Sequence, residues 1–248
     1  MRFELLNPNS AYPRATLVDP PPNGYLHLAG AVAPPSGPPL VRTVPARSAL
    51  LDRLKPLATA LQGHPAVRRV TVYRALVVPP AGGYARQPQF HQARFDVAVL
   101  VETDTPEDLG PVTGGEAYGE LRATLTAAAS DTHELRARCT RSLGAVDHSR
   151  AGLFLFNHFV AEDRAVALEL WDHLAGWYVR KTGLDNSTLL EPLDGTDSDY
   201  VFVNHARWDT SALGLLLRQV SRPSFRGYVQ QNLLVNRVGT MPVLYRMT

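Results

Sequence analysis

"GLFLFNHFVAED" at residues 152–163 has a near repeat in "DYVFVNHARWDTS" at residues 199–211. Each stretch is an apolar, strand-like run that ends in Asn-His and is followed by an acidic residue suited to begin a helix. The same polar pair therefore stands at the same point of two predicted strands. The rest of the chain indicates how these two strands are related.

The first half of the chain alternates between helical and strand periodicity. Leucines at helical spacing and a closing Gly63 predict a helix, and β-branched residues in alternation predict strands on either side of it. The predicted elements are a short strand at 25–33, a helix at 47–63, strands at 67–80 and 93–104, a helix at 114–130 and an edge strand at 133–146. Their order is β-α-β-β-α-β.

The second half repeats this order. Asp163 is placed to cap a helix that ends at Gly183, with basic residues near its negative end. The predicted elements are a strand at 152–160, that helix, a hairpin of strands at 187–193 and 199–208, helical segments at 210–220 and 223–236, and a closing strand at 240–248. The two halves therefore have the same predicted order of elements.

The order β-α-β-β-α-β is the ferredoxin-like motif. We predict an α+β fold in which two tandem ferredoxin-like repeats bury their bare sheet faces against each other as an α/β barrel. The predicted units are a proline-rich arm at 1–24, repeat 1 at 25–148 and repeat 2 at 149–248. Half of the chain's 20 prolines lie in residues 1–45, so the arm cannot form a long helix. The sequence leaves open whether the arm is ordered.

This order of elements resembles the dimeric α/β-barrel superfamily, in the form with two repeats in one chain, over residues from about 25 to 248. A more local likeness lies in "TPEDLGPVTGGEAYGEL" and "SRPSFRGYV", where Tyr118, Phe225 and Tyr228 follow a short lead-in on the first buried turn of a helix. The superfamily includes small monooxygenases of antibiotic biosynthesis, stress-responsive barrels, chlorite-dismutase-like haem proteins and haem-degrading enzymes. The resemblance implies the fold, and no catalytic residue is carried over from it.

Composition excludes several classes of function. The formal net charge is +2 without a clustered basic stripe, so nucleic-acid binding is not expected. The single cysteine, Cys139, excludes an intramolecular disulfide and a multi-cysteine metal site. Apolar runs are shorter than the roughly 18–20 residues that span a bilayer, and no secretory signal is visible, so we expect a cytoplasmic protein without a membrane contact. Nucleotide-binding and nucleophile-elbow motifs are absent.

The Asn-His pairs are the main candidate site. The first and third strands of a ferredoxin-like repeat are neighbours, and we expect them to run parallel with His158 and His205 roughly 5 Å apart at the backbone. Because side chains alternate along a strand, His158, His205 and Arg207 share one face. Asn157 and Asn204 point to the opposite face.

One hypothesis is that His158, His205 and Arg207 are catalytic. The imidazoles could act as acid and base or hold haem iron, Arg207 could hold an anion, and Asn157 or Asn204 could orient a ligand. The alternative is that the histidines are structural and bond to loops or pack between the sheets. Two histidines without a third ligand leave the usual zinc geometry incomplete, so no metal site is predicted.

Arg94 and Asp96 flank Phe95 on the matching strand of the first repeat. They could add polar groups to the ligand site, or they could be a solvated strand end. Three functions remain open: a barrel that binds a small, largely apolar molecule with oxidative or isomerising chemistry, a non-catalytic binding or assembly protein, and a haem protein with a histidine ligand. A cavity lined by both histidines would favour the first function, and a packed interior the second. An exposed edge strand at 240–248 would favour a homodimer.

Overall fold

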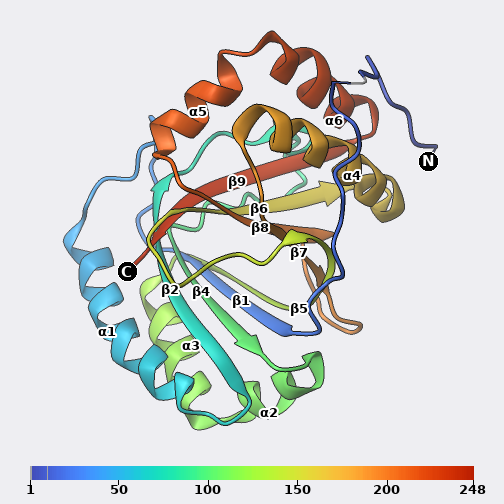
Figure 1. Cartoon of the computed structure of the whole chain (residues 1–248). Helices are drawn as coiled ribbons and strands as arrows, with labels where there is room; N and C mark the ends of the chain where they lie inside the picture. Colours follow the sequence, from blue (N-terminus) through green and yellow to red (C-terminus); the bar gives the residue numbers. More distant parts are fainter. Residues whose placement is uncertain (1, 10) are drawn as a thin grey trace.

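Strands and helices form where the periodicity predicts them, and the computed structural model describes residues 2–9 and 11–248 (Figure 1). The strands of the first half are β1 (Gly24–Ala31), β2 (Val67–Val77), β3 (Gly82–Gly83), β4 (Val97–Thr103) and β5 (Asp131–Gly144). Its helices are α1 (Pro45–Gln62), α2 (Leu109–Gly114) and α3 (Glu116–Ala128), with 3₁₀ turns η1 (Tyr84–Arg86) and η2 (Pro106–Asp108). Pro45 stands in the first turn of α1, where a backbone N–H would have no partner within the helix, so the N–H that proline lacks is not needed there.

The second half has the elements β6 (Leu153–Ala161), α4 (Arg164–Thr182), β7 (Ser187–Pro192), β8 (Phe202–Trp208), α5 (Ala212–Val220), the π-helical turn η3 (Phe225–Gln230), α6 (Gln231–Val235) and β9 (Val238–Met247). The predicted caps of α4 are confirmed. The Asp163 side chain accepts hydrogen bonds from two backbone N–H groups of the first turn, and Gly183 ends the helix with φ of 74°.

Eight antiparallel strands close into a barrel in the order β2-β4-β1-β5-β7-β8-β6-β9, with β9 pairing back to β2. Each half contributes its strands in the same order, β5-β1-β4-β2 and β9-β6-β8-β7. The predictions of an edge strand at 133–146 and at 240–248 are wrong, because β5 pairs with β1 and β7, and β9 pairs with β6 and β2. Barrel closure therefore removes the strand edges that favoured a homodimer.

The prediction that the first and third strands of the repeat run parallel is also wrong. Strands β6 and β8 are antiparallel, because the α4 crossover returns the chain parallel to β6 and the β7–β8 hairpin then reverses it. The register places His205 opposite Phe156 and His158 opposite Val203, so the two histidines are not a cross-strand pair. Asn157 and Asn204 lie directly opposite each other instead.

The helices cover the outside of the barrel, with α1 and α3 over the first half and α4, α5 and α6 over the second (Figure 1). The N-terminal segment runs along α4 and α6, where the side-chain amides of Asn232 and Asn236 bond to the backbone of Leu6 and Glu4. Residues 1 and 10 of the predicted arm lie outside the described residues. Within the described part of the chain, no helix is both long enough and apolar enough to cross a bilayer.

Candidate functional site

The histidines of both Asn-His pairs face the barrel interior, as alternation along the strands predicts. The His158 ring lies 5.4 Å from the ring of His27 and 6.2 Å from that of His133, measured between centroids. The His205 ring stacks on the Phe156 ring, with 4.2 Å between their centroids. The Phe156 ring also packs on the His27 ring, with 4.5 Å between centroids. Phe156 therefore separates the two histidines, and the interior around His158 is packed.

Burial determines the charge of these imidazoles. It lowers the pKa of His158 to about 3 and that of His133 to about 4, and it holds the pKa of His27 and His205 well below the usual value. These four side chains are neutral at pH 7. Among the described residues, neither ring nitrogen of His27 has a hydrogen-bond partner.

Arg207 has partners for its Nη2, whereas its Nε is buried without a hydrogen-bond partner among the described residues. Its Nη2 donates to the carbonyl oxygen of Ala151 at 2.7 Å and to the carboxylate of Asp209 at 2.5 Å, and its side chain is 2% exposed. Its guanidinium lies 6.0 Å from the Phe154 ring centre. The arrangement fits a structural contact at the barrel end.

Arg94 and Asp96 do not share a site. The buried Asp96 carboxylate accepts from the backbone N–H groups of Val32 and Ala33 at 2.7 and 3.0 Å and pairs with Arg47 at 2.7 Å. Arg94 is exposed and donates to the carbonyl of Pro35. Both residues precede β4, and both bond to the chain that follows β1. Their positions do not support the interpretation that they contact a ligand.

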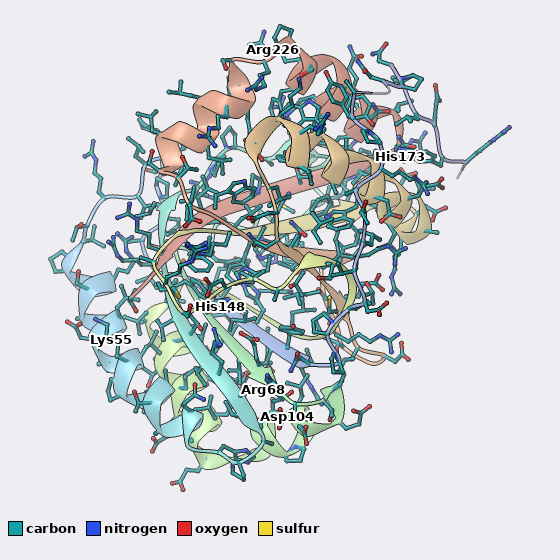
Figure 2. All side chains as sticks on the ribbon, in the orientation of Figure 1. Lys55, Arg68, Asp104, His148, His173 and Arg226 are labelled. Atoms are coloured by element: carbon teal, nitrogen blue, oxygen red, sulfur yellow. The ribbon has the colours of Figure 1, made fainter. Side chains whose placement is uncertain are left out.

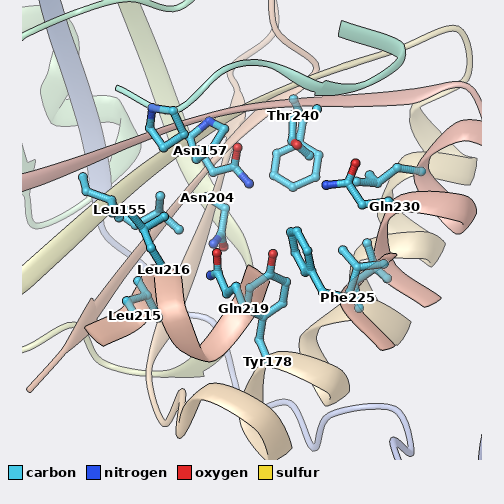
Figure 3. Close-up of a pocket in the computed structure, with 18 of the residues that line it drawn as sticks. Leu155, Asn157, Tyr178, Asn204, Leu215, Leu216, Gln219, Phe225, Gln230 and Thr240 are labelled. Atoms are coloured by element: carbon cyan, nitrogen blue, oxygen red, sulfur yellow. The ribbon is translucent and has the colours of Figure 1, made fainter. Parts of the chain in front are cut away.

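Asn157 and Asn204 line a cavity of about 230 Å³ on the outer face of the second half-sheet (Figure 3). We call it the amide cavity. It lies between strands β6, β8 and β9 on one side and α4, α5 and η3 on the other. The apolar walls include Leu155, Phe159, Trp171, Leu174, Trp208, Leu215, Leu216, Phe225, Val229, Leu233, Pro242 and Leu244.

Polar side chains from separate elements point into the amide cavity (Figure 3). They are Asn157, Asn204, Tyr178, Gln219, Gln230 and Thr240. The Asn204 Oδ1 accepts from Ser187 Oγ at 2.6 Å, which leaves the amide N–H donors on the other side of the group. The Asn157 Oδ1 is buried and has no partner in the part of the chain that the structure describes. Burial raises the pKa of Tyr178, so its phenol stays protonated at neutral pH.

The amide cavity therefore offers neutral hydrogen-bonding groups in an apolar surround. Arg86 is the one charged side chain among its described lining residues. Walls of this kind bind a largely apolar molecule and recognise a carbonyl or hydroxyl oxygen on it. The volume lies below the roughly 300–1,000 Å³ of drug-sized sites, so the cavity has room for a small molecule only.

The amide cavity does not fit haem. Among its described lining residues there is no histidine, cysteine or methionine, and Tyr178 is the one side chain of a known axial type. The raised pKa of Tyr178 disfavours the phenolate that would ligate iron. His158 and His205 lie on the other face of the sheet, among rings 4 to 6 Å away. Within residues 2–9 and 11–248, no group of three or more His, Cys, Asp or Glu side chains could hold a metal ion.

The sequence pointed to two of the polar lining residues and missed the others. Tyr178, Gln219 and Gln230 come from helices distant in sequence, and no local motif distinguishes them from solvated helix positions. A polar residue beside the leucines of α5, as in "LLLRQ", was the available signal for Gln219. The sequence alone does not show which face of that helix meets the sheet, so it predicts no role for Gln219.

No protein-family model and no curated protein sequence matches the chain. Solved structures do match it. An anthrone oxidase-like protein aligns over 91% of both chains with 13% sequence identity and a TM-score of 0.65. A protein assigned as a monooxygenase from Fusobacterium nucleatum aligns over 91% of both chains with 8% identity and a TM-score of 0.52. A dye-decolorizing protein from V. cholerae covers 93% of this chain and 95% of its own, with 14% identity and a TM-score of 0.51.

Identities this low establish the fold alone. The chain therefore shares an α+β barrel fold with these proteins.

Proposed function

We propose that the amide cavity binds a small, largely apolar molecule through a carbonyl or hydroxyl oxygen. One observation carries this proposal. At the register position where the second half has the facing pair Asn157 and Asn204, the first half has Leu28 and Val99. The two halves, which we infer to be tandem ferredoxin-like repeats, thus differ at the centre of the sheet. A pair of amides beneath a cavity supports ligand recognition more than fold stability.

The chemistry that we propose for this cavity is oxidation by dioxygen. The neighbours described as a monooxygenase and as an anthrone oxidase-like protein support this choice of reaction. A substrate with an activated CH₂ group next to aromatic rings could itself supply the electrons. It would lose two C–H hydrogens and gain one oxygen atom as a ketone, while the second oxygen atom leaves as water. The amides and the neutral Tyr178 would stabilise negative charge on the substrate oxygen, and the apolar walls would exclude water.

Anthrone, a tricyclic ketone with such a CH₂ group, is a direct probe. We expect anthrone to quench the fluorescence of Trp171 and Trp208, which line the cavity, and to bind more tightly than anthracene, which lacks the oxygen. The double variant Asn157→Leu/Asn204→Val, which copies the first half, should abolish this preference for anthrone. Asn9→Leu, at an exposed amide outside the cavity, is the matched control.

An oxygen electrode then separates catalysis from binding. Oxygen uptake that needs both protein and anthrone, and that the double variant loses, would support the oxidative reaction. Saturable binding without uptake would leave the non-catalytic alternative. If neither tricyclic molecule binds, or if the double variant binds both as well as the natural chain does, the proposal is wrong.

The homodimer also stays a prediction, with a different basis. Leu213, Leu217 and Val220 form an exposed stripe along α5, with exposed fractions of 67%, 59% and 56%. Such a stripe favours a covering partner, and we propose a second copy of this chain. Light scattering of the purified protein measures this directly: a monomer that persists at high concentration would contradict it.

A further inference from the structure

A second cavity of about 250 Å³ lies at the mouth of the barrel lumen, away from the amide cavity. We call it the mouth cavity. Its charged and titratable lining residues are Tyr25, Arg68, Arg69, Glu102, His148 and His205. Figure 2 labels His148 and Arg68 on this side of the molecule, next to β2. The proposed oxidation uses none of these groups.

Hydrogen bonds fix the orientation of the two imidazoles in the mouth cavity. The Nδ1 of His205 lies 3.0 Å from the carbonyl oxygen of Leu155, which can only accept, so this nitrogen carries the hydrogen. The Nε2 atoms of His205 and His148 are 3.0 Å apart. Because His205 is neutral, its Nε2 accepts and His148 donates. The remaining nitrogen of a neutral His148, Nδ1, is then an acceptor.

That acceptor faces a second one. The Oε1 of Glu102 lies 3.5 Å from Nδ1 of His148, and it is buried without a hydrogen-bond partner among the described residues. Its side chain is 16% exposed, so bulk water screens it little. Two acceptors thus converge on the mouth cavity, and a donor group that carries at least two hydrogens would satisfy both.

A cation stands beside this pair of acceptors. The Nε of Arg69 is 3.9 Å from Oε1 of Glu102, which is an ion pair but too long for a hydrogen bond. Arg68 precedes Arg69 on the same strand and pairs with Asp104 at 3.2 Å. A ligand that donates to the acceptors and also pairs with the arginine therefore carries a donor and an anionic group within about 4 Å of each other.

We infer that the mouth cavity binds a small carboxylate with a hydroxyl or ammonium group on the adjacent carbon. The carboxylate would pair with Arg69. An ammonium group, with three hydrogens, would donate to both Glu102 and His148, whereas a hydroxyl, with one hydrogen, would donate to one of them. An α-substituted acid places these two groups on neighbouring atoms, which matches the spacing of 3.9 Å between the arginine and the glutamate. The Tyr25 ring and Thr188 complete the wall on the lumen side.

Three probes test the mouth cavity by calorimetry and by the ¹⁵N NMR signals of the histidine rings. Glycolate carries the hydroxyl, glycine carries the ammonium group, and acetate carries neither. We expect glycolate or glycine to bind about tenfold or more tightly than acetate, which corresponds to one well-made hydrogen bond to a charged group. The tighter-binding of glycolate and glycine shows whether the donor is a hydroxyl or an ammonium group. Its binding should shift the Nδ1 signal of His148.

Variants assign the effect to residues. Glu102→Gln, which keeps the shape of the side chain, should remove the preference over acetate. Arg69→Gln should weaken all carboxylate probes by about tenfold. Arg74→Gln is the control, because Arg74 lies exposed on the same strand outside the mouth cavity. If Arg69→Gln fails to fold, Arg68→Gln, at a side chain that is 59% exposed, replaces it.

Two results would overturn the inference. One is that acetate binds as tightly as glycolate and glycine. The other is that none of the three probes moves the His148 signal in the natural chain. Neither result bears on the amide cavity, which lies on the other face of the sheet and binds anthrone or fails to do so independently.

Discussion

The two half-sheets have the same strand order, but the side chains at the centre of their outer faces differ in polarity. In the first half, Leu28 on β1 faces Val99 on β4, and both are buried, with exposed fractions of 2% and 0%. In the second half, Asn157 on β6 faces Asn204 on β8 at the corresponding pair. The apolar pair lies under a filled core, whereas the amide pair lies under a cavity.

The helices above these pairs differ in the same way. Leu54 of α1 and Leu121 and Leu125 of α3 are fully buried and fill the space over the first half-sheet. Over the second half, the last crossover is divided into the short α5, a π-helical turn and α6. A π turn displaces side chains from regular packing and is common at functional sites. Side chains thus fill the space over the first half-sheet, whereas the second half leaves a cavity, which we propose as the binding site.

Both halves share the lumen, so acid that protonates its buried histidines should destabilise the whole barrel. Burial lowers the pKa of His133 and His148 to about 4 and that of His158 to about 3, whereas an unfolded histidine titrates near 6.5. Between pH 6.5 and the folded values the unfolded chain binds more protons, so stability falls as the pH falls. At pH 5 the three residues together lower the free energy of unfolding by about 6 kcal/mol, at about 1.36 kcal/mol per pH unit for each group.

Urea unfolding at pH 7 and pH 5 measures this loss, and His27→Leu is the diagnostic variant. The His27 ring is fully buried with no partner for either nitrogen in the described chain, so leucine should stabilise the protein and reduce its sensitivity to acid. His91 works in the other direction: burial lowers its pKa, but Asp199 and Asp131 outweigh burial and raise it. His91 therefore stabilises the fold at low pH. A stability that does not change between pH 7 and pH 5 would contradict the neutral lumen.

Exchanging residues between the halves tests their division of roles. Leu28→Asn puts an amide into a filled core without a partner, and we expect it to destabilise the protein by about 3–4 kcal/mol. Asn157→Leu puts an apolar group against an apolar cavity and removes a buried oxygen without a partner, so we expect a change within about 1 kcal/mol or a small gain. Denaturant midpoints at equal slope compare the two variants.

A mirror pair extends the test to the facing strand. Val99→Asn should again be costly. Asn204→Val should cost more than Asn157→Leu, because it removes the acceptor 2.6 Å from Ser187 Oγ and leaves that hydroxyl only the longer contact of 3.3 Å to the carbonyl oxygen of His205. Equal losses for Leu28→Asn and Asn157→Leu would show that the two faces are equally dependent on packing. The comparison between a stabilising half and a binding half would then be wrong.

The sequence predicted the order of elements because helical and strand periodicities are local, and it predicted the opposite faces of Asn157 and His158 because neighbours on a strand alternate. It could not predict which face would have free space. That depends on how the distant Tyr178 and Gln230 pack above the sheet. The direction of β8 follows from the hairpin, and assigning it as parallel misplaced His205.

The sequence could not predict the surroundings of Asp96 for a similar reason. Its role as a buried anchor depends on Arg47, which lies on α1 and reaches the carboxylate through the tertiary fold. A polar residue at the start of a strand looks the same in sequence whether it is solvated, binds a ligand or forms a buried ion pair. Only the packing of α1 on the sheet decides among these cases.

The smallest expected effect contrasts a helix from each half. Gly119 lies inside α3, and an added Cβ there would meet no atom of the described residues within 4 Å. Gly119→Ala should therefore stabilise the protein by about 0.5–1 kcal/mol through the lower entropy of the unfolded chain. Gly176 lies inside α4, where a Cβ would lie only 1.8 Å from the carbonyl oxygen of Pro13. Gly176→Ala should therefore displace the N-terminal segment and cost about 1–3 kcal/mol. Thermal unfolding gives both signs, and faster proteolysis near Pro13 in Gly176→Ala alone would assign the loss to that contact. Stabilisation by both substitutions would mean that the N-terminal segment does not pack on α4 in solution.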